Sequence, residues 1–158
     1  MNEILPRLYV GGATDAQLVD GVYSLLNVMW DGEEFCFPKY ATHMKTLGFN
    51  RKTEITETDI PVMEAAADWI HERVSSGQHV LVHCAFGMER SPLTVLWYLM
   101  RYHKMSLDEA YSLLKKKREE VLDRREWLPE FVQRTGKLPA RVPSVQGVTG
   151  TIIVPSTY

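Results

Sequence analysis

Several residues whose side chains could take part in a reaction stand close together in the stretch VLVHCAFGMERSP, which covers residues 80–92. The apolar run before His83 is typical of a strand, and the apolar residues after Pro92 are typical of a helix. Cys84 therefore falls at the point where a strand gives way to a loop that leads into a helix. A cysteine in that position can serve as a nucleophile once its thiol has lost a proton.

The loop that follows Cys84 has the composition of an anion-binding loop. A loop that enters a helix presents backbone N–H groups inward, and the helix dipole adds positive potential, which suits a phosphate-sized dianion. Gly87 permits the backbone twist that such a ring of amides requires. Arg90 supplies a planar guanidinium that matches two phosphoryl oxygens. The expected phosphate-binding residues are Ala85, Phe86, Gly87, Met88, Glu89 and Arg90.

The same positive potential should favour the thiolate form of Cys84. Comparable surroundings bring the pKa of a cysteine from about 8.5 to between roughly 3.5 and 7.5. A thiolate attacks phosphorus without a base, so His83 is expected to orient the loop through hydrogen bonds instead. Ser91 is expected to bond the sulfur and to help it leave in a second step.

The pattern H-C-x-x-G-x-x-R-S resembles the signature of the cysteine-dependent protein tyrosine phosphatase superfamily, in the form typical of its dual-specificity group. A second segment, ILPRLYVGGATDA followed by SLLNV, looks like the opening strand, helix and strand of these small phosphatases. The likeness covers about residues 3–134. It implies a phosphatase that acts on phosphorylated proteins or peptides through a phosphocysteine intermediate, with no metal and no cofactor. The residues that match the signature are His83, Cys84, Gly87, Arg90 and Ser91.

A phosphate ester also needs an acid that protonates its leaving oxygen. The resemblance places an aspartate just after an upstream strand, and in TEITETDIPVMEAAADWI that position is held by Asp59. Asp59 would protonate the leaving group and then activate water. Glu57 and Glu89 stay open as alternatives, and the H-C-x-x-x-x-E-R pattern is also similar to that of rhodanese-fold cell-cycle phosphatases. Asp59 could instead simply complement the dipole of a helix opened by Pro61.

The predicted elements alternate between strands and helices as far as His83, and only helices follow. Strands are expected at 8–10, 24–30, 52–56 and 80–82. Helices are expected at 15–20, 39–47, 61–76, 93–102 and 127–134. A further helix is expected to begin at the capping box of Ser106 and Glu109. This order predicts an α/β fold with a mostly parallel central sheet of four to five strands, flanked by helices on both faces. Ligands of such sheets collect at the carboxyl ends of the strands, where Cys84 lies.

The 158 residues suit one ordinary domain. We expect a catalytic domain over residues 1–138 and a C-terminal extension over residues 139–158, whose TIIV segment could pair with a sheet edge. The net charge of −2 argues against nucleic acid as a partner. No apolar run approaches the roughly 18 residues of a membrane span, and no signal peptide is apparent. We therefore expect a cytoplasmic monomer. We expect Cys36 to be a small buried apolar residue in preference to a redox partner of Cys84.

Three functions remain open from the sequence. The first is an enzyme with a shallow site that accepts both phosphotyrosine and phosphoserine or phosphothreonine, since the short chain lacks obvious room for elements that deepen the pocket. The second is a phosphatase-like binding module with little turnover. The third keeps the chemistry of the first but acts on a non-protein phosphate, such as an RNA 5′-phosphate, a lipid or a sugar phosphate.

Overall fold

A six-stranded sheet forms the centre of the computed structural model, which describes residues 1–19, 22–29, 42–46, 54–141 and 151–154. The strands lie in the order β1-β2-β5-β3-β4-β6. Four inner strands run parallel, namely β2 (Leu8–Gly11), β5 (His79–His83), β3 (Tyr23–Asn27) and β4 (Thr42–Thr46). The edge strands β1 (Asn2–Leu5) and β6 (Thr151–Val154) are antiparallel to their neighbours. The mostly parallel α/β sheet is as predicted. The two short edge strands bring the number of described strands to six, above the predicted four to five.

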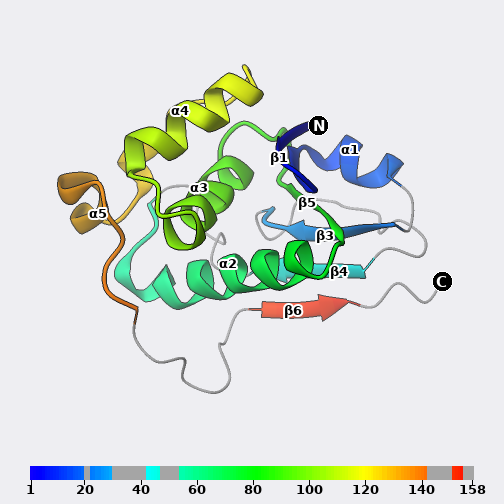
Figure 1. Ribbon diagram of the computed structural model, residues 1–158, viewed down its shortest axis with the longest axis horizontal. Helices are drawn as coiled ribbons and strands as arrows, with labels where there is room; N and C mark the ends of the chain where they lie inside the picture. Colours follow the sequence, from blue (N-terminus) through cyan, green and yellow to red (C-terminus); the bar gives the residue numbers. More distant parts are fainter. Residues whose placement is uncertain (20–21, 30–41, 47–53, 142–150, 155–158) are drawn as a thin grey trace.

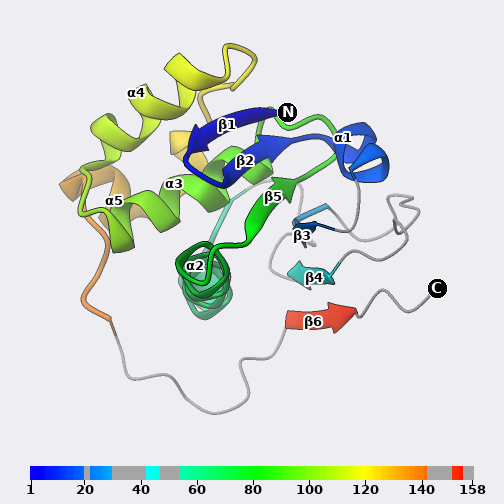
Figure 2. The same ribbon diagram turned by 45° about the vertical axis from the view of Figure 1, so that its right-hand side comes forward.

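Helices cover both faces of this sheet, as Figures 1 and 2 show. On one face α1 (Ala13–Leu18) buries Ala16 against Leu25 and Leu81. The other face carries α2 (Ile60–Ser75), α3 (Arg90–Tyr102), α4 (Leu107–Lys117) and α5 (Glu130–Thr135). Short 3₁₀ turns span Glu57–Asp59 and Arg125–Trp127. The prediction of helices on both faces is confirmed.

Helix α3 is the buried centre of the larger helical layer. Every residue from Arg90 to Met100 is buried, and Trp97 is fully enclosed. The helix packs against α2, α4 and strands β2 and β5. Each buried large apolar side chain stabilises the fold by about 1.5–3 kcal/mol. The amino terminus of α3 is thereby held rigidly next to the end of β5.

Two predicted elements are wrong in the part of the chain that the structure describes. Residues 42–46 of the expected helix 39–47 form strand β4, because parallel pairing with β3 and antiparallel pairing with β6 override the local preference. Residues 54–56 of the expected strand 52–56 belong to no strand. Glu54 adopts a left-handed φ of 49°, and the Ile55 N–H donates to the carbonyl of Trp127 at 2.6 Å. Residues 39–41, 47 and 52–53 lie outside the described residues.

Other local predictions are confirmed. Ser106 and Glu109 form the expected capping box, with the Glu109 N–H donating to Ser106 Oγ at 3.2 Å and the Ser106 N–H donating to Glu109 Oε1 at 3.1 Å. The TIIV segment pairs with the edge of the sheet as β6. The division of the chain at residue 138 stays a prediction. No helix in the described ranges is long and apolar enough to cross a membrane.

Candidate active site

The site lies where β5 ends and α3 begins. In the register of the parallel strands His83 stands opposite both Gly11 of β2 and Asn27 of β3, so three strands deliver their carboxyl ends to this point. His83 is fully buried, and its carbonyl accepts a hydrogen bond from the Val28 N–H at 2.9 Å. The structure thus places His83 where it fixes the start of the loop, while a role for its ring in orienting the loop stays a prediction.

The sulfur of Cys84 meets one group from the middle of the loop and one from the first turn of α3. The Gly87 N–H donates to Cys84 Sγ at 3.3 Å, and Ser91 Oγ lies 3.3 Å from the same sulfur. The Cys84 N–H donates to the carbonyl of Gly11 at 3.4 Å, which anchors the cysteine to β2. The expected contact between Ser91 and the sulfur is present.

These surroundings act on the charge state of the thiol. Burial by itself raises the pKa of Cys84, but hydrogen bonds from the Ser91 hydroxyl and backbone, the positive charge of Arg90 and the Gly87 N–H outweigh it. The net result is a pKa of Cys84 below that of an ordinary thiol. A lowered pKa increases the fraction of thiolate, which is the nucleophilic form.

Four successive carbonyl groups of the loop are held from outside it. The Ala13 N–H donates to Ala85 O at 3.0 Å, and the Leu122 N–H donates to Met88 O at 2.9 Å. Between them, Arg118 donates from Nη2 to Phe86 O at 3.2 Å and from Nε to Gly87 O at 2.8 Å. No described peptide bond is cis, so each carbonyl points opposite to the N–H of the following residue. The amides of residues 86–89 therefore lie on the side of the loop away from these donors. That is the arrangement an anion-binding loop requires.

Comparison with known proteins agrees with this geometry. Residues 8–134 match the family model described as dual specificity phosphatase, catalytic domain. The chain belongs to the dual specificity phosphatase family. The predicted resemblance, which rested on the loop and on the amino-terminal segment, is confirmed.

Individual members of the dual specificity phosphatase family resemble the chain at moderate identity. Human dual specificity protein phosphatase 1 is 30% identical over 136 residues, which cover 83% of this chain and 36% of that protein. Human dual specificity protein phosphatase 5 is 30% identical over 149 residues, covering 91% and 38%. The chain therefore spans well under half the length of these relatives. The crystal structure of human DUSP28 superposes with a TM-score of 0.65 at 23% identity, covering 80% of this chain and 86% of that one, which supports the fold.

In this dual specificity phosphatase domain two backbone segments touch so closely that glycine is required. Gly87 has a φ of 70°, and a Cβ there would lie 2.6 Å from the carbonyl carbon of Gly11. A Cβ on Gly12 would lie 2.8 Å from the carbonyl oxygen of Ala85. The turn between β2 and α1 thus supports the loop from one side. Sequence reasoning missed this role, although the pair Gly11-Gly12 directly after a strand was a visible signal.

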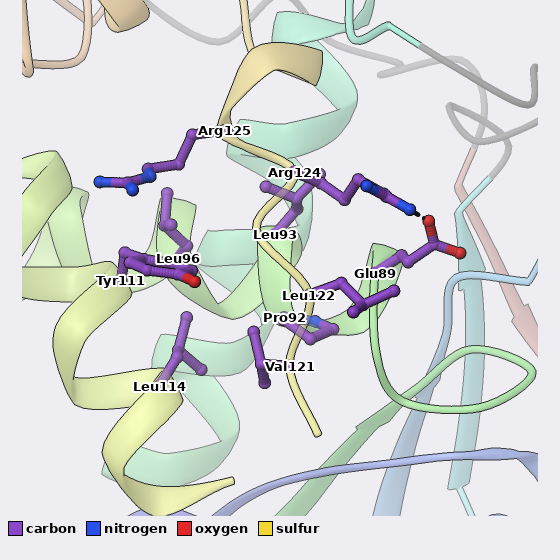
Figure 3. Close-up of a pocket in the computed structure, with 10 residues that line it drawn as sticks. All are labelled: Glu89, Pro92, Leu93, Leu96, Tyr111, Leu114, Val121, Leu122, Arg124 and Arg125. Atoms are coloured by element: carbon purple, nitrogen blue, oxygen red, sulfur yellow. Dashed lines mark hydrogen bonds and ion pairs between the residues drawn. The ribbon is translucent and has the colours of Figure 1, made fainter. Parts of the chain in front are cut away.

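Arg90 and Glu89 join the loop to α3. Arg90 is 3% exposed and is the first residue of that helix. Its positive charge lies near enough to Cys84 to lower the pKa of the thiol. Glu89 Oε2 accepts a hydrogen bond from Arg124 Nε at 2.6 Å, as Figure 3 shows at the rim of a small apolar hollow. Arg124 offsets the negative charge that Glu89 brings next to Arg90. This partner could not be predicted from the sequence, because Arg124 lies 35 positions away on a different segment.

The proposed acid, Asp59, is 7% exposed and ends the 3₁₀ turn Glu57–Asp59. Its Oδ2 accepts from the Thr56 N–H at 2.8 Å and from Thr56 Oγ1 at 3.1 Å. The carboxylate therefore caps the 3₁₀ turn, while α2 receives no side-chain cap hydrogen bond from Asp59. The role of Asp59 as general acid and its alternative role toward the helix dipole both stay predictions. Glu57 is exposed on the same turn. Cys36 lies outside the described residues, and within them no three His, Cys, Asp or Glu side chains group as metal ligands would.

Proposed function

We propose that this chain hydrolyses phosphotyrosine and phosphoserine or phosphothreonine in proteins, through a phosphocysteine intermediate on Cys84. One observation carries the proposal most directly. The Cys84 thiol has a lowered pKa and lies beneath a loop whose carbonyls are held outward, next to the buried Arg90. A nucleophile and a receptor for a phosphoryl group are thus combined in one short segment. Membership in the dual specificity phosphatase family supports the same chemistry.

In the first step the phosphoryl oxygens bind the loop amides and the Arg90 guanidinium. The Cys84 thiolate attacks phosphorus, the bond from phosphorus to the ester oxygen breaks, and Asp59 gives its proton to the leaving oxygen. The Arg90 guanidinium can hold two equatorial oxygens at once, because its donors lie in one plane. The products of this step are the dephosphorylated residue and phosphocysteine.

In the second step water attacks the phosphorus of phosphocysteine. The Asp59 carboxylate takes a proton from this water, the phosphorus–sulfur bond breaks, and inorganic phosphate is released. The sulfur leaves as a thiolate, which the Ser91 hydroxyl stabilises by donating a hydrogen bond. The mechanism requires no metal, because the fixed dipoles and Arg90 supply the positive potential.

The decisive experiment measures hydrolysis of p-nitrophenyl phosphate by the purified chain, with EDTA and with orthovanadate as separate additions. We expect activity that resists EDTA and is inhibited by vanadate. A panel of phosphopeptides and phosphorylated metabolites then ranks the substrates, with phosphopeptides expected first. Binding of phosphopeptides without turnover would favour the binding module instead. Preference for RNA 5′-phosphates, lipids or sugar phosphates would move the substrate class while keeping the chemistry.

A further inference from the structure

Arg118 is a buried cation that contacts the loop from behind. It follows the last residue of α4 and is 8% exposed. Its Nε donates to the carbonyl of Gly87 at 2.8 Å, and its Nη2 donates to the carbonyl of Phe86 at 3.2 Å. Its Nη1 donates to Asn2 Oδ1 at 2.7 Å, on strand β1. One guanidinium therefore joins two successive peptide groups of the loop to the edge of the sheet.

The bond to Phe86 acts on the same peptide group that contacts the nucleophile. The carbonyl of this group, on Phe86, accepts from Arg118, while its N–H, on Gly87, donates to Cys84 Sγ at 3.3 Å. A trans peptide is planar, and its C=O and N–H point in opposite directions. By holding the Phe86 carbonyl, Arg118 thus sets the direction in which the Gly87 N–H points on the opposite side of the peptide group.

This control matters because Gly87 allows its neighbouring peptide planes to rotate. Glycine occupies positive and negative φ with similar ease, so residue 87 by itself does not determine which way these planes face. A flipped plane would turn a carbonyl oxygen toward the thiolate and toward any bound phosphate, which repels both. The planar fork of Arg118 fits two successive carbonyls at once, which the point charge of a lysine does not reproduce.

We propose that Arg118 is a positioning residue that keeps the peptide planes on both sides of Gly87 with their N–H groups toward the sulfur and the phosphate. The proposal rests on the proposed function, since it assigns the direction of the donors that would bind the substrate. It extends the machinery of the site to the end of α4. Arg118 itself lies behind the loop and acts through the Phe86 and Gly87 carbonyls.

The test uses the full chain with Arg118→Met and Arg118→Lys, and with Arg125→Met as the matched control. Arg125 pairs with Asp123 and Asp108 on the surface of a nearby segment. Two measurements report on the loop without requiring turnover, namely the affinity for orthovanadate and the pH dependence of Cys84 alkylation by iodoacetamide. For Arg118→Met we expect vanadate affinity to fall about ten- to hundredfold, as for loss of hydrogen bonds to a charged group. We also expect the alkylation midpoint to move to higher pH. Arg118→Lys should lie between Arg118→Met and the wild type, and Arg125→Met should match the wild type.

A purely structural role would lower the melting temperature of Arg118→Met while leaving both measurements on the folded protein unchanged, and that result would overturn the proposal. If Arg118→Met fails to fold, Arg118→Lys decides, and wild-type vanadate affinity and alkylation in that variant would overturn it. An equal effect of Arg125→Met would do the same. Absence of hydrolysis by the wild type would contradict the proposed function alone, because vanadate binding and thiol titration still report on Arg118.

Discussion

Ser91 Oγ lies 3.3 Å from Cys84 Sγ and also 3.3 Å from the carbonyl oxygen of Gly11, to which it donates. A hydroxyl carries one proton, so it can donate to only one of these two acceptors at a time. When Cys84 is a neutral thiol, the Ser91 hydroxyl can keep donating its hydrogen bond to the Gly11 carbonyl. When the sulfur is charged, the hydroxyl can turn to it, so this arrangement selectively stabilises the thiolate.

Replacing Ser91 with Ala should raise the pKa of Cys84 and slow the release of the sulfur from phosphocysteine. The reason is that the thiolate and the leaving sulfur both lose their hydroxyl donor. The pH dependence of alkylation measures the first effect, and accumulation of phosphocysteine in rapid-quench experiments measures the second. Thr94→Ala is the control, because the Thr94 hydroxyl is buried on the same helix but donates to the Arg90 carbonyl. An alkylation profile equal to that of the wild type would contradict the assigned role.

The lowered pKa of Cys84 predicts a specific pH dependence of its reactivity. Alkylation in the folded protein should reach its plateau below the ordinary thiol pKa of about 8.5 and should fall as pH drops through the folded value. The related contribution to stability is fully present above the unfolded pKa and is lost as pH falls through the folded pKa. The measurement uses a Cys36→Ser background, so that only one thiol reacts. In guanidinium chloride the midpoint should return to the ordinary value, and identical midpoints in both states would contradict the prediction.

Cys84→Ser should abolish hydrolysis while leaving phosphate-ester binding largely intact. The serine hydroxyl is a poor nucleophile without a base, whereas the loop amides and Arg90 are unchanged. Calorimetry with a phosphopeptide measures binding, and the p-nitrophenyl phosphate assay measures turnover. Measurable hydrolysis by this variant, in protein free of wild-type enzyme, would exclude Cys84 as the nucleophile.

Arg90→Lys should lower kcat/KM by about 10²-fold or more, in line with the loss of a preorganised donor in a site of this kind. Lysine keeps the charge but cannot hold two phosphoryl oxygens in one plane. Steady-state kinetics and vanadate affinity should both show the loss. Circular dichroism should remain that of the wild type, because Lys can still begin helix α3. Kinetics close to those of the wild type would indicate that charge alone suffices.

Asp59→Asn should lower kcat by about 10²–10³-fold and flatten the basic limb of the pH profile, as expected for loss of a general acid. Asparagine keeps an oxygen that can accept from the Thr56 N–H, so the turn is expected to survive. Glu57→Gln on the same turn is the control. A profile like that of the wild type would assign the acid to Glu57 or Glu89. Of these two, Glu89 is engaged by the Arg124 guanidinium.

The sequence by itself predicted the features that depend on neighbours in the chain. Strand β5, the loop and helix α3 follow one another without interruption, so the place of Cys84 between them could be derived from periodicity and residue type. The capping box of Ser106 and Glu109 is equally local. Hydrogen bonds of this kind form between residues a few positions apart, and a short pattern is enough to predict them.

Only the tertiary structure decided what surrounds the loop. The bond from Ser91 to Gly11 spans 80 positions, that from Arg118 to Gly87 spans 31, and that from Arg124 to Glu89 spans 35. Pairing with β3 likewise made a strand of residues 42–46, where the local pattern indicated a helix. Such contacts arise from the packing of distant segments, and local propensity carries no information about which segments will meet. The position of Cys84 between a strand and a helix thus follows from local sequence, whereas its loop meets its distant hydrogen-bond partners only through the fold.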